Sequence, residues 1–159
     1  MSRYILHRIG EDFNVTITLA PKLFPDWNGS GCHTNYSTKT MRAGTGGMEY
    51  IKAIIAKMAS QHRAHLEIYG EDNDQRLTGD CETSSMDTFS YGVGNRAASI
   101  RIPTSTAHAN GKGYIEDRRP ASNIDPYLVC AMIVDTTLIE ESLAGDLKTA
   151  FNDWKVWKK

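Results

Sequence analysis

The sequence predicts one α+β domain in which short strands are interspersed with amphipathic helices. Its 159 residues, 40% of them hydrophobic and 23% charged, have the composition of a globular protein that can bury a core. Apolar residues recur at helical spacing in some stretches and alternate with polar residues in others. The first pattern predicts helices and the second predicts strands, and together they give the order of elements along the chain.

The first half of the chain is predicted to fold as helix, strand, connector and strand. These elements cover residues 2–13, 15–19, 20–27 and 32–38 in turn, and the connector contains two prolines. The glycine-rich break at 44–47 then precedes a helix. Its apolar stripe runs from Met48 through Ile51, Ile54, Ile55 and Met58 to His62 and Leu66, which makes it the clearest element of the sequence.

The second half begins with residues 71–87, which lack periodicity and are predicted to form a long functional loop. Three strands are predicted after it, at 89–93, 98–102 and 114–116, with a loop at 104–113 before the last one. Asp125 and Pro126 match the N-cap and first position of a helix that continues toward Gly145. The tail from 146 to 159 again has apolar residues at helical spacing.

Charge and hydropathy exclude several functions. Eighteen Lys and Arg against nineteen Asp and Glu give a net charge of -1, so no general field attracts nucleic acid or an anionic membrane. The longest apolar run, residues 127–134, is far shorter than the ~20 residues of a spanning helix. No secretory signal is apparent, and the three cysteines are expected to be reduced, so we expect a cytoplasmic protein with neither a membrane nor a nucleic-acid partner.

Five arginines stand at strand ends or in loops. Arginine makes planar bidentate contacts with carboxylate and phosphate groups, whereas lysine acts as a point charge. A solvated surface and an anion site are both open, and Arg96 favours the site because neighbouring glycines allow close backbone approach. The five are Arg76, Arg96, Arg101, Arg118 and Arg119.

His33 and Glu116 stand on two predicted strands, and together an imidazole and a carboxylate can ligate Mg²⁺ or Mn²⁺. Two ligands do not define a site, and spacing alone favours a hydrogen-bonded structural histidine. Residues 44–47 could cradle a phosphate but lack the Walker A pattern, so helix punctuation is the simpler interpretation. No serine or cysteine has the setting of an activated nucleophile, which disfavours acyl-enzyme chemistry.

Four separated motifs resemble those of eukaryotic-type glutamine synthetases, in the same order. They are residues 26–38 (DWNGSGCHTNYST), 76–79 (RLTG), 95–101 (NRAASIR) and 114–120 (YIEDRRP). The resemblance extends over residues 2–140 and implies an α+β fold of antiparallel strands from an incomplete glutamine-synthetase-type catalytic barrel with flanking helices. It implies a partial catalytic domain over 1–143 and a C-terminal helical tail over 144–159.

The resemblance implies a reaction in which ATP phosphorylates the side-chain carboxylate of glutamate and ammonia displaces the phosphate. Mg²⁺ or Mn²⁺ and arginines then neutralise charge on the transferring phosphoryl group. The implied catalytic residues are Glu82, Arg96 and Arg118, with Glu82 on a flap that closes over the site and helps deprotonate ammonium. The implied metal ligands are His33 and Glu116.

The resemblance also implies residues that hold substrate and nucleotide. The implied glutamate-binding residues are Asp26, Trp27, Asn28, Gly29, Arg76, Arg96 and Arg118. The implied ATP-binding residues are Asn35, Tyr36, Ser37, Arg96, Arg101, Tyr114, Ile115 and Glu116. Two positions depart from the family pattern, since Cys81 replaces a usual His and Ile115 a usual Phe or Tyr, and both changes predict a looser flap or nucleotide pocket.

The family pattern begins upstream of the first residue of this chain. The resemblance therefore implies that the N-terminal β-grasp domain and the first half of the barrel, with its paired metal-binding glutamates, are absent. We expect an oligomeric ligase-family protein that needs a complementary N-terminal half or full-length glutamine synthetase subunits for glutamine synthesis. The alternative is a non-catalytic remnant that binds nucleotide or associates with such subunits, and whether the isolated chain is an enzyme stays open at this point.

Overall fold

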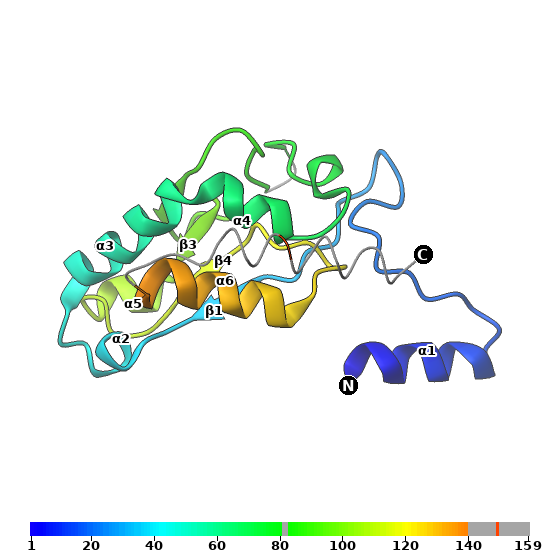
Figure 1. Cartoon of the computed structure of the whole chain (residues 1–159), viewed down its shortest axis with the longest axis horizontal. Coiled ribbons are helices and arrows are strands. Elements are labelled where there is room, and N and C mark those ends of the chain that lie inside the picture. The colour runs from blue at the N-terminus through cyan, green and yellow to red at the C-terminus, as the bar shows by residue number, and fades with distance from the viewer. Residues whose placement is uncertain (81–82, 140–148, 150–159) are drawn as a thin grey trace.

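A computed structural model describes residues 1–80, 83–139 and 149, and its centre is a four-stranded sheet with the order β1-β4-β3-β2 (Figure 1). Strands β1 (Thr34–Tyr36) and β3 (Ile100–Ile102) both pair antiparallel with β4 (Ile115–Asp117). Strand β2 (Tyr91–Val93) pairs parallel with β3. The α+β prediction is confirmed, but among the described residues the sheet is not closed, so a barrel stays a prediction.

The expectation that all strands are antiparallel is wrong for β2. Residues 94–99 return the chain to the start of the neighbouring strand, a short connection for a parallel pair. Gly94, with φ of 65°, donates its N–H to Ile102 across this connection, at an N···O distance of 2.9 Å. Ser90 and Ser99 also exchange side-chain to backbone hydrogen bonds of 3.2 and 3.3 Å, so local polar contacts hold the parallel register.

Helices α3 (Gly47–Ser60), α4 (His62–Ile68) and α6 (Pro126–Leu138) form the layer that packs on the sheet (Figure 1). The core between them consists of buried isoleucines and methionines, among them Ile55, Met58, Ile100, Ile115 and Met132. The sequence predicts α3 and α4 as one helix, but the structure breaks it at Gln61. Helix α6 begins where Asp125 predicts, because its carboxylate accepts hydrogen bonds from the backbone N–H groups of Tyr127 and Leu128.

Three short elements were not expected from periodicity. Helix α2 (Lys39–Ala43) begins at the N-cap Thr38, helix α5 (Thr104–His108) lies in the predicted loop, and η1 is a 3₁₀ turn (Asn73–Gln75). Each is too short to show a helical repeat in the sequence. No described helix has the length and apolar character that crossing a membrane requires.

Helix α1 (Ser2–Asp12) is confirmed and stands apart from the body of the chain in Figure 1. Its Arg3 donates hydrogen bonds of 2.7 Å to the carbonyls of Ser122 and Ile124.

The strand predicted over 15–19 is wrong, since these residues have no regular structure and Val15 is 56% exposed. An alternating sequence forms a strand only where a partner accepts its backbone hydrogen bonds, and no described strand lies beside this one. The helix predicted over 146–159 lies outside the described residues, apart from Thr149.

Candidate functional site

Glu116 lies at the centre of a group of polar residues on one face of the sheet. Its partners in register are Asn35 on β1 and Arg101 on β3, and residues directly opposite in a sheet project to the same side. Ile115, one position earlier, projects to the opposite side into the helix-covered core. We call the side that carries Asn35, Arg101 and Glu116 the site face.

Three cationic or hydrogen-bonding side chains converge on the carboxylate of Glu116, which is 6% exposed. His33 Nδ1 lies 3.0 Å and Arg118 Nη1 3.4 Å from Oε1. Arg101 forms an ion pair with Oε2, without the geometry of a hydrogen bond. Sequence motifs more than 80 positions apart therefore meet at one carboxylate.

The contact with Glu116 determines the tautomer of His33. A carboxylate only accepts, so His33 Nδ1 carries the proton and Nε2 keeps its lone pair. Burial and the nearby charge of Arg118 lower the pKa of His33 despite the opposing effect of Glu116. The ring is therefore neutral at neutral pH, which is the form that ligates metals.

The chemical types of His33 and Glu116 suit Mg²⁺ or Mn²⁺, but their number does not complete a site. Within residues 1–80 and 83–139, no three His, Cys, Asp or Glu side chains come close enough to hold one ion. Mg²⁺ and Mn²⁺ favour about six ligands, mostly oxygen. The described residues fit such an ion as a partial site.

Arg76, implied to hold substrate, is 4% exposed and binds the backbone that leaves β4. Its Nη2 donates to the carbonyls of Arg118, Arg119 and Pro120 at 3.2, 2.5 and 3.2 Å. Burial, then the charge of Arg118, lowers the pKa of Arg76 to about 10, so it stays charged at neutral pH. In this structure Arg76 anchors the segment beside the site.

The implied glutamate-binding stretch, residues 26–29, packs beside Arg76. A Cβ on Gly29 would lie 2.4 Å from Cγ of Arg76 and 2.7 Å from the carbonyl of Pro21, so only glycine fits there. Asp26, Trp27 and Asn28 are exposed, and the ring of Trp27 lies 5.3 Å from that of Phe24. The structure thus brings this loop close to the chain that follows β4.

The implied nucleotide-binding residues divide between the two sides of the sheet. Asn35, Arg101 and Glu116 share the site face, as the register requires. Tyr36 projects to the helices, where its hydroxyl lies 2.7 Å from that of Thr137, and Ile115 is fully buried in the core. Only the backbone of Tyr36 and Ile115 can reach a ligand on the site face.

The remaining implied residues lie around the ends of the strands. Ser37 follows β1 and donates a 2.6 Å hydrogen bond to the carbonyl of Gly113, and Tyr114, 36% exposed, precedes β4. Arg96 is exposed in the turn between β2 and β3. Glu82 and Cys81 lie outside the described residues.

A surface cavity of about 530 Å³ lies between residues 22–25 and Gln75, Thr78 and Asp80, and none of the residues around Glu116 lines it.

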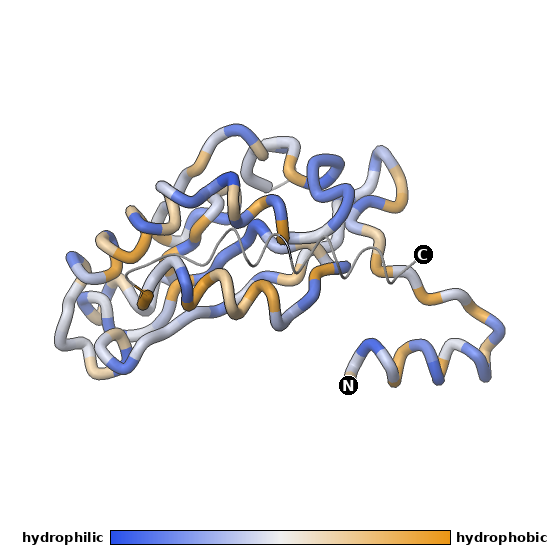
Figure 2. Tube along the Cα trace, viewed as in Figure 1, coloured by the Kyte–Doolittle hydropathy of each residue, from blue (hydrophilic) through white to orange (hydrophobic). Residues whose placement is uncertain are grey.

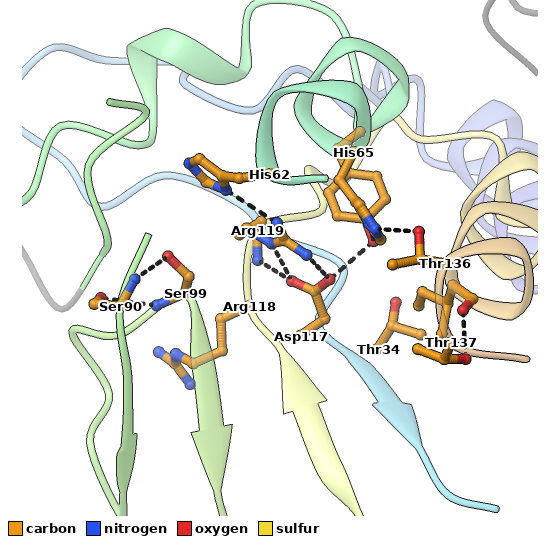
Figure 3. Close-up of polar contacts among 12 residues, drawn as sticks. Thr34, His62, His65, Ser90, Ser99, Asp117, Arg118, Arg119, Thr136 and Thr137 are labelled. Carbon is orange, nitrogen blue, oxygen red and sulfur yellow. Dashed lines mark hydrogen bonds and ion pairs between the residues drawn. The ribbon is translucent and has the colours of Figure 1, made fainter. Parts of the chain in front are cut away.

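A buried ionic network lies on the opposite side of the same strand (Figure 3). Asp117 and Arg119 are both fully buried and form a bidentate pair, with N···O distances of 2.9 and 2.8 Å. Tyr69 donates to Asp117 at 2.8 Å, and His62 Nδ1 accepts from Arg119 at 3.0 Å. For Arg119, the solvated-surface interpretation is wrong.

The sequence contained a signal for this network. Strand alternation from the buried Ile115 places Asp117 and Arg119 on the core side and Glu116 and Arg118 on the site face. Burial alone would raise the pKa of Asp117, but the charge and hydrogen bonds of Arg119 outweigh it, so its pKa lies below the usual value. Burial would lower the pKa of Arg119, and Asp117 raises it. The pair is ionised in the folded protein.

Known proteins are similar to this chain over most of its length. The family described as glutamine synthetase, catalytic domain, matches residues 1–139. The chain is 56% identical to a glutamine synthetase of Yarrowia lipolytica, covering 92% of this chain and 42% of that protein. It is 58% identical to the Saccharomyces cerevisiae glutamine synthetase (86% and 36%) and 57% identical to glutamine synthetase root isozyme 3 of Zea mays (87% and 39%).

The chain spans well under half the length of these relatives. The matched region includes all four motifs and every described residue that surrounds Glu116. The chain belongs to the glutamine synthetase family and corresponds to part of its catalytic domain.

Proposed function

We propose that this chain supplies the metal- and nucleotide-binding wall of a glutamate–ammonia ligase, which makes glutamine at the expense of ATP. The observation that carries the proposal is the convergence of His33, Arg101 and Arg118 on Glu116. This group combines ligands for a divalent cation with guanidinium groups for an anion, as phosphoryl transfer requires. Residues 1–143 would form the partial catalytic domain, and residues 144–159 a helical tail.

The proposed roles follow the placement of the side chains. His33 and Glu116 would hold Mg²⁺ or Mn²⁺, and the bound ion would neutralise charge on the phosphates of ATP. Arg101 and Asn35, beside Glu116 in register, would contact the nucleotide. Arg96 and Arg118 would bind the transferring phosphoryl group, and residues 26–29 with Arg76 would frame the glutamate.

Glutamine synthesis by this chain is proposed to require the remaining half of the barrel. Two metal ligands from the described residues leave a cation weakly held, which leaves the transferring charge poorly neutralised.

Ile5, Leu6 and Ile9 on α1 are between 44% and 49% exposed, and Figure 2 shows hydrophobic residues on α1 and on the segment after it. This apolar surface supports association with a complementary N-terminal half in a cytoplasmic oligomer.

Phosphate release that depends on both glutamate and ammonia tests this function. The purified chain alone is expected to give none above background. Adding the N-terminal half of the Yarrowia lipolytica relative is expected to restore it, and an Arg118→Ala chain in the same mixture is expected to remain inactive. A restored rate that is equal with Arg118→Ala would refute the proposed role of Arg118.

Nucleotide binding by the isolated chain is a separate test. We expect ADP binding that Arg101→Ala abolishes and that Arg63→Ala leaves unchanged, since Arg63 is exposed on α4. Isothermal calorimetry measures both. Equal affinity in the wild type and Arg101→Ala would place the nucleotide elsewhere.

The alternative function is association without turnover, and the sheet favours it because β1 and β2 form the edges of the described sheet. Sedimentation of the chain mixed with the full-length Yarrowia lipolytica glutamine synthetase distinguishes the two functions. Co-sedimentation without restored phosphate release from the mixture of halves supports association alone. Restored phosphate release supports the ligase.

A further inference from the structure

Strand β4 alternates between the two sides of the sheet, and each side holds different chemistry. Glu116 and Arg118 project to the site face. Asp117 and Arg119 project into the buried network, as Figure 3 shows. The backbone between them is shared, so the position of the buried pair constrains where the side chain of Glu116 leaves the backbone. A shift of Asp117 therefore moves Glu116.

All the acceptor positions of Asp117 that face the network are used. Oδ1 accepts from the backbone N–H of Arg119 at 3.1 Å and from its Nε at 2.9 Å. Oδ2 accepts from Nη2 of Arg119 and from the hydroxyl of Tyr69, both at 2.8 Å. Four hydrogen bonds hold one carboxylate in one orientation, and the two bonds from the Arg119 side chain also set the end of the strand.

The partners of this pair are themselves ordered by hydrogen bonds. Because Tyr69 donates to Asp117, it accepts from His65 Nδ1 at 2.5 Å, and His65 Nε2 then accepts from Thr136 at 2.9 Å. Because Arg119 donates to His62 Nδ1, the Nε2–H of His62 donates to the carbonyl of Met86 at 3.1 Å. Donation runs from Thr136 on α6 through His65 and Tyr69 to Asp117, and from Arg119 through His62 to the 83–89 segment, without a conflict.

The guanidinium of Arg119 also lies near two aromatic rings. Its Cζ lies 5.3 Å from the ring centroids of both Tyr69 and Phe89. On the other side of the segment, Arg76 binds the carbonyls of residues 118–120. The backbone from Asp117 to Pro120 is thus fixed by side-chain contacts and by carbonyl contacts.

We infer that Asp117 and Arg119 are positioning residues for Glu116, and that they set the His33–Glu116 contact that presents His33 Nε2 to a ligand. The inference deepens the proposed function, on which its metal-binding part rests. Groups that orient a metal ligand without touching the metal typically change its affinity by about 10–100-fold. The tautomer of His33 reports the same positioning without any metal.

The test combines ¹⁵N NMR of the His33 ring with Mn²⁺ binding followed by electron paramagnetic resonance. Arg119→Lys keeps the charge but loses the bidentate pair, and Tyr69→Phe removes a single hydrogen bond to Asp117. The control is Met58→Ala, a fully buried apolar position on α3 whose side chain makes none of the network's hydrogen bonds or ion pairs, so the variant lowers stability without removing one of them. All spectra are recorded on folded protein, at a pH where the imidazole is neutral.

We expect the wild type to show His33 protonated on Nδ1. Arg119→Lys should shift the ring toward the mixture of tautomers seen in free histidine and weaken Mn²⁺ binding about tenfold. Tyr69→Phe should cause a smaller shift of the His33 tautomer and a smaller loss of Mn²⁺ affinity. This variant decides the question if Arg119→Lys does not fold. Met58→Ala should change neither measurement.

An unchanged His33 spectrum in folded Arg119→Lys or Tyr69→Phe overturns the inference, as does a change of the same size in Met58→Ala. A wild type without the Nδ1-protonated form also overturns it, because the contact to be positioned is then missing. A wild type with that form that binds no Mn²⁺ refutes the proposed metal site, and the NMR comparison of the variants alone then decides the positioning.

Discussion

His65 is a neutral histidine held between two hydroxyl groups. It is fully buried on α4, and its ring nitrogens contact Tyr69 and Thr136. Burial, followed by the charge of Arg119, lowers the pKa of His65 to about 3. In the unfolded chain the ring takes up a proton near its ordinary pKa of 6.5. Folding therefore excludes a proton that the unfolded chain binds below that pH.

This difference predicts how stability depends on pH. The contribution of His65 is fully present above pH 6.5 and is lost as the pH falls from 6.5 toward 3, because only the unfolded state gains the proton in that window. The loss amounts to at most about 1.4 kcal/mol per pH unit for this residue. Urea unfolding at pH 7, 6 and 5 measures it.

His65→Gln is the matched comparison, since it keeps a polar side chain that does not titrate. The variant should be less stable at pH 7, and its free energy of unfolding should fall less between pH 7 and 5 than that of the wild type. Parallel curves for the two proteins would show that His65 is not the titrating group.

Residue types and family motifs predicted the residues that gather around Glu116 better than they predicted the buried support. His33, Arg101, Arg118 and Glu116 were each identified by a motif, and the structure brings them together. The burial of Arg119 was not predicted, because a charged side chain in a polar motif is usually solvated. Its partners on α4 and in the 83–89 segment are set by tertiary packing, which spacing does not encode.

At the scale of elements, α6 has the best-defined start. Asp125 Oδ1 accepts the N–H of Tyr127 at 2.8 Å and that of Leu128 at 3.4 Å. Asp125→Ala should lower the free energy of unfolding by about 1 kcal/mol, because it leaves helix N–H groups without a side-chain acceptor. Thermal unfolding measures the loss. Asp125→Asn keeps the acceptor and should retain most of the stability, so equal losses in both variants would contradict a capping role.

The turn before β4 approaches the start of α3 closely at Gly111. A Cβ there would lie 2.5 Å from the carbonyl carbon and oxygen of Gly47, and φ is 85°. Gly79 has a similar φ of 88°, but the nearest atom to its Cβ would be 3.8 Å away. Comparing alanine substitutions at the two positions therefore separates the cost of backbone strain from the cost of the steric clash.

Gly79→Ala should cost about 1–2 kcal/mol through backbone strain alone. Gly111→Ala should cost clearly more, since backbone atoms must also move apart. Chemical unfolding of the two variants gives the comparison. Equal losses would mean that α3 and the turn are not held in close contact.

Elements with a long repeat or a clear cap were predictable, and short or partner-dependent ones were not. The stripe from Met48 to Met58 and the cap at Asp125 identified α3 and α6. The alternation at 15–19 predicted a strand that needs a neighbour, and the described residues supply none. The parallel pairing of β2 depends on the turn at Gly94, which periodicity does not reveal.

At the scale of the molecule, one side of the sheet is a hydrophobic layer and the other carries the site. Helices α3, α4 and α6 cover the first side, whereas α1 stands apart with Ile9 49% and Phe13 73% exposed (Figures 1 and 2). The relatives are more than twice as long as the matched region. The family resemblance predicted strands with flanking helices, but neither it nor the local patterns predicted this division between the two sides.

The central claim is that the ligand groups share one face of one sheet, around Glu116. NMR of the chain titrated with a small amount of Mn²⁺·ADP tests it directly, because the paramagnetic ion broadens the nearest signals first. The account predicts that the side-chain signals of His33 and Asn35 broaden before the methyl groups of Ile55 and Met132 in the core. Broadening that begins in the core methyl groups, or around Leu23 and Gln75 at the surface cavity, would contradict it.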